Sequence, residues 1–175
     1  SEPEKDYVHL LLQRFAAENE GRPPQSLVEN IADFERGYGT LDIAKRFQKH
    51  AEFQADVVIL AIGENVPRLA TAEDKARFKK AVAELLATLK TERKTQRIFV
   101  RSMFWPDPAK DEILSQVCTD ANGKFVDLAE VAKDPASRAS AERKFNHAGV
   151  GGHPGDKGMA GIADAIWKAW KQLPK

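Results

Sequence analysis

The fold is decided by the stretch Ala55-Asp-Val-Val-Ile-Leu-Ala-Ile-Gly-Glu-Asn-Val-Pro67. Residues 57–62 form a continuous apolar run with β-branched side chains at four of six positions. Such a run is typical of a strand buried on both faces of a parallel sheet. Gly63 permits a sharp turn, and Glu64 and Asn65 follow at the carboxyl end of the predicted strand. Because open α/β sheets bind ligands at that end, Gly63-Glu-Asn65 is a candidate site, with an ordinary loop as the alternative.

The rest of the chain alternates between helix and strand patterns. Apolar residues at three- and four-residue spacing predict helices over residues 6–19, 41–51, 71–89, 109–119 and 159–173. Further strands are predicted over residues 98–105 and 124–128, with a short one within residues 26–34. This alternation predicts an α/β three-layer sandwich with a mainly parallel, flavodoxin-like sheet, as one domain over residues 1–175.

Composition limits the classes of function. The formal net charge is +1 at pH 7, so bulk electrostatics predict no strong attraction to nucleic acid or to an anionic membrane. No apolar run reaches the roughly 18 to 20 residues of a membrane span, and no signal-peptide pattern opens the chain. Cys118 is the only cysteine, which excludes an internal disulfide and a thiolate metal cluster. We expect Cys118 to be a buried small hydrophobe, and we expect no metal or cofactor. The compartment stays open between bacterial-type cytoplasmic and secreted.

A glycine-rich loop precedes the last predicted helix: His147-Ala-Gly-Val-Gly-Gly-His-Pro-Gly-Asp-Lys-Gly-Met159. A histidine held on such a loop is a natural general base, because its unperturbed pKa lies near neutrality. His153 is therefore a candidate catalytic residue. The alternative is a histidine that only caps the helix or makes a structural hydrogen bond.

Three blocks of the sequence resemble the SGNH (GDSL-like) hydrolases, in the same order and at similar separations. His153-Pro-Gly-Asp-Lys-Gly158 with the following helix is similar to the family's closing block, which supplies the catalytic histidine. Gly63-Glu-Asn65 is similar to its Gly-x-Asn block, in which the asparagine donates to the oxyanion. The glycine oxyanion donor of the family corresponds by spacing to Gly37, and Gly63 is a weaker candidate.

The resemblance implies hydrolysis of a small-molecule ester, such as an acetylated sugar, through a serine ester intermediate. His153 would accept the serine proton and return it to the leaving alcohol. Asn65 and a glycine N–H would stabilise the oxyanion, each such donor typically contributing about 3 to 4 kcal/mol.

The sequence departs from the family at two places. The family's nucleophile lies in a Gly-(Asp or Asn)-Ser motif after the first strand, and neither that motif nor that strand is present here. The expected explanations are a missing N-terminal segment or a strand exchanged with a second copy, because an open slot beside the strand at residues 57–62 leaves backbone groups unpaired. Ser102 and Ser1 are the alternative nucleophiles, and a packing or surface role is the alternative for both.

The second departure concerns the acid partner of the histidine. The family usually has aspartate three residues before the histidine, where this sequence has Val150. His147 and Glu142 are nearby in sequence, but neither clearly replaces the missing aspartate as the partner of His153. The alternative arrangement is a Ser-His dyad without an acid partner. A non-catalytic, flavodoxin-like domain that binds a ligand or a partner is the competing hypothesis for the whole chain.

Overall fold

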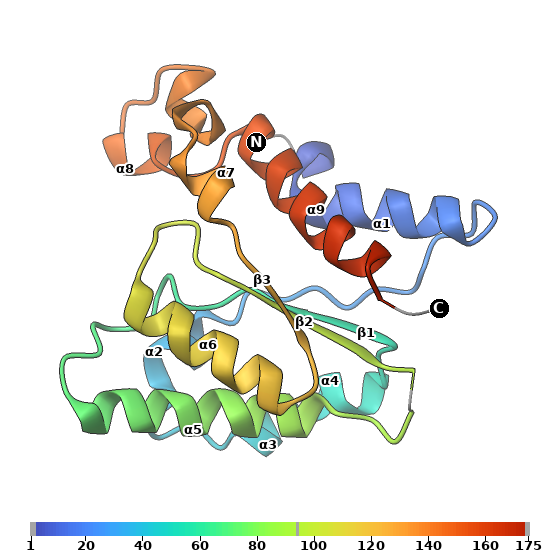
Figure 1. Ribbon diagram of the computed structural model, residues 1–175, viewed down its shortest axis with the longest axis vertical. Helices are drawn as coiled ribbons and strands as arrows, with labels where there is room; N and C mark the ends of the chain where they lie inside the picture. The colour runs from blue at the N-terminus through green and yellow to red at the C-terminus, as the bar shows by residue number, and fades with distance from the viewer. Residues whose placement is uncertain (1–2, 94, 174–175) are drawn as a thin grey trace. The chain divides into compact units, whose positions relative to one another are not determined.

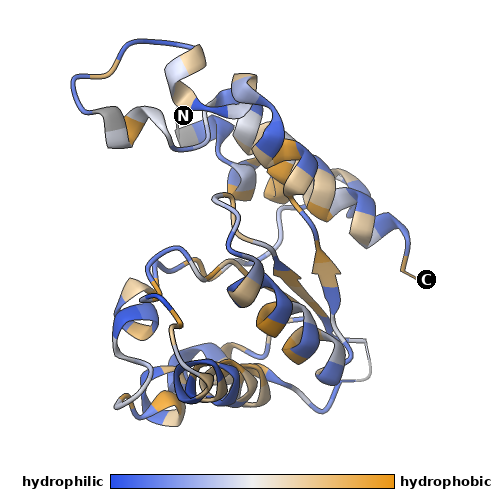
Figure 2. Ribbon diagram, turned by 60° about the vertical axis from the view of Figure 1, so that its left-hand side comes forward, coloured by the Kyte–Doolittle hydropathy of each residue, from blue (hydrophilic) through white to orange (hydrophobic). Residues whose placement is uncertain are grey.

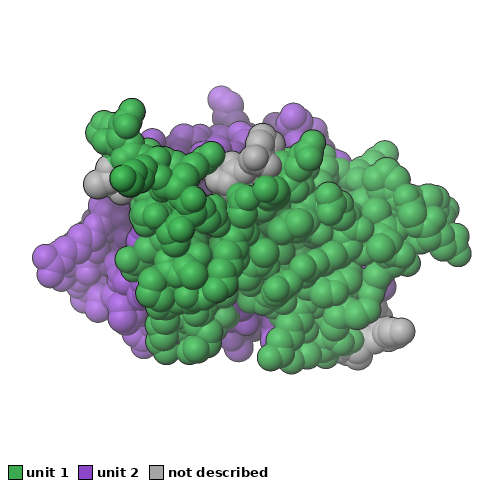
Figure 3. Space-filling model, turned by 90° about the horizontal axis from the view of Figure 1, so that it is seen from above, with its two compact units in different colours: residues 1–26, 127–175 green, residues 27–126 purple. Residues whose placement is uncertain are grey.

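The computed structural model describes residues 3–93 and 95–173. The chain divides into two compact units, one made of Leu27–Val126 and the other of Ser1–Ser26 with Asp127–Lys175 (Figure 3). Each unit has its own helices and buried side chains. The single domain over residues 1–175 stays a prediction.

The unit Leu27–Val126 contains a three-stranded sheet in the order β1-β2-β3, with every neighbouring pair parallel. Its elements in chain order are α2 (Ala32–Gly37), α3 (Ile43–Arg46), α4 (Gln48–Phe53), β1 (Val57–Leu60), α5 (Ala72–Leu89), β2 (Arg97–Arg101), α6 (Pro108–Asp120) and β3 (Lys124–Val126). Helices α5 and α6 connect successive strands and lie side by side along the sheet (Figure 1). The predicted α/β class with a parallel sheet is confirmed.

The core of this unit lies between the sheet and these helices. The strands are mainly hydrophobic, whereas α5 and α6 carry hydrophobic residues on one side and polar residues on the other (Figure 2). The most deeply buried core side chains are Phe34, Ile62, Phe78, Val82, Leu85, Val100, Leu114 and Cys118. Burial raises the pKa of the Cys118 thiol to about 11. The thiol is therefore protonated near neutral pH and is not a nucleophile, as the prediction of a small buried hydrophobe implies.

Local signals set the helix starts that the sequence predicted. The Thr71 hydroxyl accepts the Asp74 N–H at 3.1 Å, and the Asp74 carboxylate accepts the Thr71 N–H at 3.0 Å. This reciprocal capping box satisfies two amides that have no partner inside the helix. Pro108 occupies the first turn of α6 behind the N-cap Asp107, where a missing N–H costs nothing.

The predicted strand within residues 26–34 is wrong. Residues 22–31 have no regular secondary structure, Val28 is 63% exposed, and α2 begins at Ala32. The Asn30 side chain accepts the Ala32 N–H at 3.0 Å, which starts the helix. Ile31, Phe34 and Tyr38 then lie at helical spacing and pack into the core.

Two other predicted elements are shorter than expected. The helix predicted over residues 41–51 is broken at Phe47 into α3 and α4. Strand β2 ends at Arg101 rather than near residue 105. The Ser102 N–H still bonds to the Val126 carbonyl, but the amides beyond it bond to side chains, the Met103 N–H to Asp111 at 2.8 Å and the Phe104 N–H to Glu64 at 3.3 Å, so the strand does not continue.

Strand β1 lies at one edge of the sheet. It pairs with β2, and no strand within residues 3–93 and 95–173 pairs with its other edge. A short strand near Leu27 would have formed the other side of the slot or paired directly with β1, and that strand does not form. That a further segment or a second copy covers the β1 edge stays a prediction.

In the unit of residues 1–26 and 127–175, helices α1 and α9 pack along each other (Figure 1). The elements of this unit are η1 (Pro3–Lys5), α1 (Tyr7–Glu18), α7 (Ala129–Lys133), η2 (Pro135–Ser137), η3 (Ala139–Ala141), α8 (Ala148–Gly151) and α9 (Asp156–Lys171). The ring of Phe15 on α1 packs edge-on against Trp167 and Trp170 of α9, with centroid distances of 5.3 and 5.1 Å. Both helices were predicted from their apolar spacing.

In the described part of the chain, no helix combines the length and the apolar character that crossing a membrane requires.

Candidate active site

The loop that follows β1 is the centre of the candidate site. It runs from Gly63 to Val66, and the Val66 N–H donates to the Gly63 carbonyl at 3.2 Å, closing a tight turn. The turn carries Asn65 into solvent at the carboxyl end of β1. This is the end at which parallel sheets bind their ligands, so the sequence prediction for Asn65 agrees with its place in this unit.

Gly63 is required at the start of this loop for two reasons. Its φ is +123°, a conformation that residues with a side chain rarely adopt. A Cβ atom built there would also lie 2.8 Å from both Cγ and Sδ of Met103, which follows β2. Backbone conformation and close packing therefore both select glycine.

Replacing Gly63 with alanine is expected to lower the free energy of unfolding by about 2 to 4 kcal/mol, since strain and overpacking add. Urea unfolding followed by circular dichroism measures the change. Gly37→Ala is the matched control: a Cβ at Gly37 meets no atom within 4 Å, so we expect a change of about 1 kcal/mol or less. Equal destabilisation by both substitutions would contradict this account of Gly63.

A buried carboxylate on α2 holds the loop from one side. Glu35 is 5% exposed. Its Oε1 accepts the backbone N–H of Gly63 at 2.6 Å and that of Asn65 at 3.1 Å, and its Oε2 accepts Nδ2 of Asn65 at 2.7 Å. Three N–H donors offset the desolvation of a buried carboxylate, and they fix the backbone and side chain of Asn65 together.

The residue after Glu35 contacts the other end of the same amide. Nη2 of Arg36 donates to Oδ1 of Asn65 at 3.0 Å. A carboxylate can only accept and a guanidinium can only donate, so the two contacts determine which end of the Asn65 amide is nitrogen. One hydrogen of Nδ2 points to Glu35, and the second has no acceptor among the residues that the structure describes.

A buried lysine on α6 holds the loop from the other side. Lys110 is 6% exposed, and its Nζ donates to the carbonyl of Gly63 at 3.1 Å and to that of Val66 at 2.6 Å. Its ammonium group also lies 3.5 Å from the Asp107 carboxylate. The loop thus presents its N–H groups to an anion and its carbonyls to a cation, which restricts its movement.

Glu64, the middle residue of the Gly-x-Asn block, points towards the next strand. Its Oε1 accepts Nη1 of Arg101 at 2.8 Å, and the same Nη1 donates to the Ser102 carbonyl at 2.8 Å. This pair ties the loop after β1 to the end of β2. Ser102, the alternative nucleophile, is 4% exposed and donates its backbone N–H to the Val126 carbonyl at 2.9 Å.

His153 lies in the other unit, on the loop between α8 and α9, and its residue is exposed. Its backbone N–H donates to the Val150 carbonyl at 3.2 Å, and its carbonyl accepts the Ala139 N–H at 2.8 Å. Pro154 forms an antiparallel bridge with Arg138. The backbone of the predicted general base is therefore held on both sides.

Packing explains one glycine of the His-Pro-Gly segment, Gly158. A Cβ at Gly158 would collide with the backbone carbonyl of Ser137, whereas one at Gly155 would meet the end of the exposed Glu142 side chain, which can move away. Glu142 accepts the Lys157 N–H at 3.0 Å in the first turn of α9, so this carboxylate is engaged as a helix cap. Val150, which replaces the family's aspartate, is 49% exposed.

The structure brings some of the predicted site residues together. Asn65 and Gly63 share one loop, and Gly37 ends the helix α2 whose side chains contact that loop. The Gly63 N–H donates to Glu35, so it is engaged and not offered to a ligand. His153 belongs to the other unit, and Ser1 lies outside the described residues. The roles of His153, Asn65 and Gly37 stay predictions.

Sequence reasoning missed Glu35, Arg36, Lys110 and Arg101. Glu35, Lys110 and Arg101 are buried charged residues, and Arg36 is an exposed one that contacts Asn65. A charge beside core positions, such as Glu35 next to Phe34, was the only available signal, and it is a weak one because charged residues are usually exposed.

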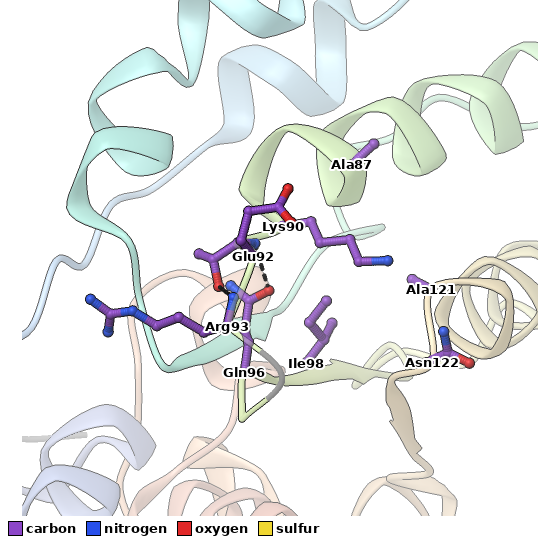
Figure 4. Close-up of a pocket in the computed structure, with 9 residues that line it drawn as sticks. Ala87, Lys90, Glu92, Arg93, Gln96, Ile98, Ala121 and Asn122 are labelled. Atoms are coloured by element: carbon purple, nitrogen blue, oxygen red, sulfur yellow. Dashed lines mark hydrogen bonds between the residues drawn. The ribbon is translucent and has the colours of Figure 1, made fainter.

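A pocket exists at the opposite end of the sheet (Figure 4). It is lined by Ala87, Lys90, Thr91, Glu92, Arg93, Gln96, Ile98, Ala121 and Asn122, around the amino end of β2. Gln96 accepts the Thr91 N–H at 3.0 Å and donates to the carbonyls of Ala55 and Leu89, both at 3.0 Å. These bonds give Gln96 a structural role, and the pocket is remote from the Gly63 loop.

The unit Leu27–Val126 therefore has a parallel α/β sheet with Asn65 held at its carboxyl end, and the other unit carries His153 on the loop ahead of the last helix. The chain belongs to the GDSL-like Lipase/Acylhydrolase family, whose model matches residues 2–160. This membership confirms the resemblance noted from the sequence and supports a general acylhydrolase or esterase. A search of curated proteins and of solved structures found no match to the chain.

Proposed function

We propose that this protein is a serine ester hydrolase of the SGNH type that cleaves small acyl esters, acetyl esters among them. The observation that carries the proposal is the Asn65 amide. It is exposed at the carboxyl end of β1, and Glu35 and Arg36 orient it so that one N–H is left for a ligand. A fixed dipole that needs no change of charge suits the stabilisation of an oxyanion.

The proposed reaction has two halves. A serine Oγ attacks the ester carbonyl carbon while His153 accepts the hydroxyl proton, and the carbonyl oxygen becomes an oxyanion that accepts the Asn65 N–H. The intermediate then releases the alcohol, which receives the proton from His153 and leaves an acyl-serine. Water repeats the sequence on the acyl-serine and releases the carboxylic acid. Gly37, the glycine donor that the resemblance implies, is the sixth residue of α2, where backbone N–H groups bond within the helix, so this proposal rests on Asn65 as the oxyanion donor.

The nucleophile is proposed to come from outside the 175 residues, since they contain no Gly-(Asp or Asn)-Ser motif. Ser102 is a poor alternative because it is buried at the end of β2. A fluorophosphonate probe labels an activated serine, and peptide mass spectrometry then identifies the labelled residue.

The test compares the 175-residue chain with the full-length natural protein, meaning this chain together with any residues that its gene encodes before or after it, in an assay with p-nitrophenyl acetate and p-nitrophenyl octanoate. We expect the full-length protein to hydrolyse the acetate ester with the higher kcat/KM and to be labelled at a serine outside this sequence. Absence of hydrolysis of both esters, together with absence of labelling, would overturn the proposal. It would favour the non-catalytic ligand- or partner-binding domain.

A further inference from the structure

We propose that Glu35 is a positioning residue for the esterase reaction, which it assists by holding the Asn65 side chain in its donating orientation. This inference rests on the proposed function, and it assigns a role to a residue outside the motifs that carry the family resemblance. Glu35 touches no substrate in this proposal and acts only through Asn65.

The two oxygens of Glu35 have separate tasks. Oε1 accepts both backbone N–H groups, at 2.6 Å from Gly63 and 3.1 Å from Asn65, and so fixes the turn. Oε2 accepts Nδ2 of Asn65 at 2.7 Å and so fixes the amide. One substitution can therefore change the side-chain contact while it preserves the backbone contacts.

Glutamine at position 35 is the substitution that changes the contact with the Asn65 side chain and preserves the two backbone contacts. Its carbonyl oxygen can replace Oε1 and keep both backbone N–H groups. Its NH₂ group then replaces Oε2 and faces the NH₂ group of Asn65, which places two donors against each other.

A flip of the Asn65 amide would relieve that conflict and turn Nδ2 towards the guanidinium of Arg36, which now donates to Oδ1 at 3.0 Å. Arg36 is exposed and would then have to move away from this second pair of opposed donors. In a rotated and in a flipped side chain alike, Nδ2 leaves its present donating position. Because misplacement of a catalytic group by about 1 Å can cost about 10²-fold in rate, we expect a loss of that order in kcat.

The experiment is a double-mutant cycle on the full-length natural protein with p-nitrophenyl acetate, using Glu35→Gln, Asn65→Ala and the double variant. We expect Glu35→Gln to lower kcat by about 10²-fold with little change in KM. In the Asn65→Ala background, Glu35→Gln should have almost no further effect, because its target is gone. Glu73→Gln is the control, since Glu73 is an exposed partner of Arg77 on α5 and should leave kcat unchanged.

The outcomes separate this inference from the proposed function. If the full-length protein hydrolyses the ester and Asn65→Ala leaves kcat unchanged, Asn65 is not the oxyanion donor, and both the proposed mechanism and this inference are overturned. If Asn65→Ala lowers kcat and Glu35→Gln does not, only the role of Glu35 is overturned. If Glu35 has only a structural role, Glu35→Gln should lower kcat equally in the natural protein and in the Asn65→Ala variant. That result would also reject the inference.

A second measurement does not depend on activity. In a ¹H–¹⁵N spectrum, the two Nδ2 protons of Asn65 should give well separated resonances, because only one of them bonds to a carboxylate. Glu35→Gln should bring them towards the positions of a free amide, whereas the backbone resonances of Gly63 should stay dispersed. Unchanged Nδ2 resonances in the variant would show that Glu35 does not hold the amide.

Discussion

Replacing His153 with alanine is expected to remove nearly all esterase turnover of the full-length protein, lowering kcat by about 10²- to 10⁴-fold. The proposed mechanism makes one imidazole both the acceptor of the serine proton and the donor to the leaving alcohol, so both halves of the reaction lose their proton carrier. The side chain is exposed, and its backbone is fixed by Val150 and Ala139, so the fold should survive. Steady-state kinetics with p-nitrophenyl acetate and a thermal melt test both statements.

His147→Ala is the comparison for His153→Ala, because His147 is the other histidine of this segment and was considered as a partner of His153. His147 is also exposed and precedes α8 on the same glycine-rich segment, but it makes no side-chain cap bond there. The His147→Ala variant should retain normal kcat. Imidazole added to the His153→Ala variant should restore part of the rate, because a small base can enter the vacated space. A large loss in His147→Ala with little loss in His153→Ala would show that the general base has been assigned to the wrong residue.

Replacing Asn65 with alanine is expected to lower kcat by about 10²- to 10³-fold, which corresponds to about 2.7 to 4 kcal/mol of transition-state stabilisation. KM should change little, because the N–H bonds strongly only when the carbonyl oxygen becomes an anion. The truncation leaves the Gly63 and Lys110 contacts of the loop in place but removes the donor to Oε2 of buried Glu35, so stability should fall by about 1 to 3 kcal/mol.

Two further substitutions sharpen the test of Asn65. Asn65→Asp places a second carboxylate against Glu35 Oε2 and removes the donor, so we expect it to be at least as inactive as alanine at neutral pH. Asn19→Ala, on the exposed end of α1, is the control and should keep full activity. A rise in KM at constant kcat in Asn65→Ala would identify Asn65 as a substrate contact and not an oxyanion donor.

The regular elements that sequence reasoning predicted well carry strong local signals. Helix α5 has an apolar stripe and a capping box, and β1 has a run of β-branched residues; both formed close to their predicted positions. The segment at residues 26–34 was predicted wrongly because its apolar residues fit both periods over so short a length. Residues 26–31 form no regular structure, and the Asn30 contact with the Ala32 N–H stands at the start of helix α2; such contacts are hard to recognise in advance.

Some residues of the candidate site could be found from the sequence, and others could not. His153 and Asn65 could be singled out because glycines and prolines mark their loops and because the blocks resemble a known family. Glu35, Lys110 and Arg101 could not, because a charged residue is usually exposed and no local pattern says which one will be buried. Their roles depend on contacts across 28 to 47 positions of sequence.

The sequence by itself determined the alternation of helix and strand, the parallel sheet, and the loop after β1 on which Asn65 lies. These follow from hydrophobic periodicity and from turn residues, which act over a few positions of the chain. Only the tertiary structure decided how that loop is held. Burial of the Glu35 carboxylate and the Lys110 ammonium requires partners for both, and the N–H groups and carbonyls of residues 63–66 are those partners.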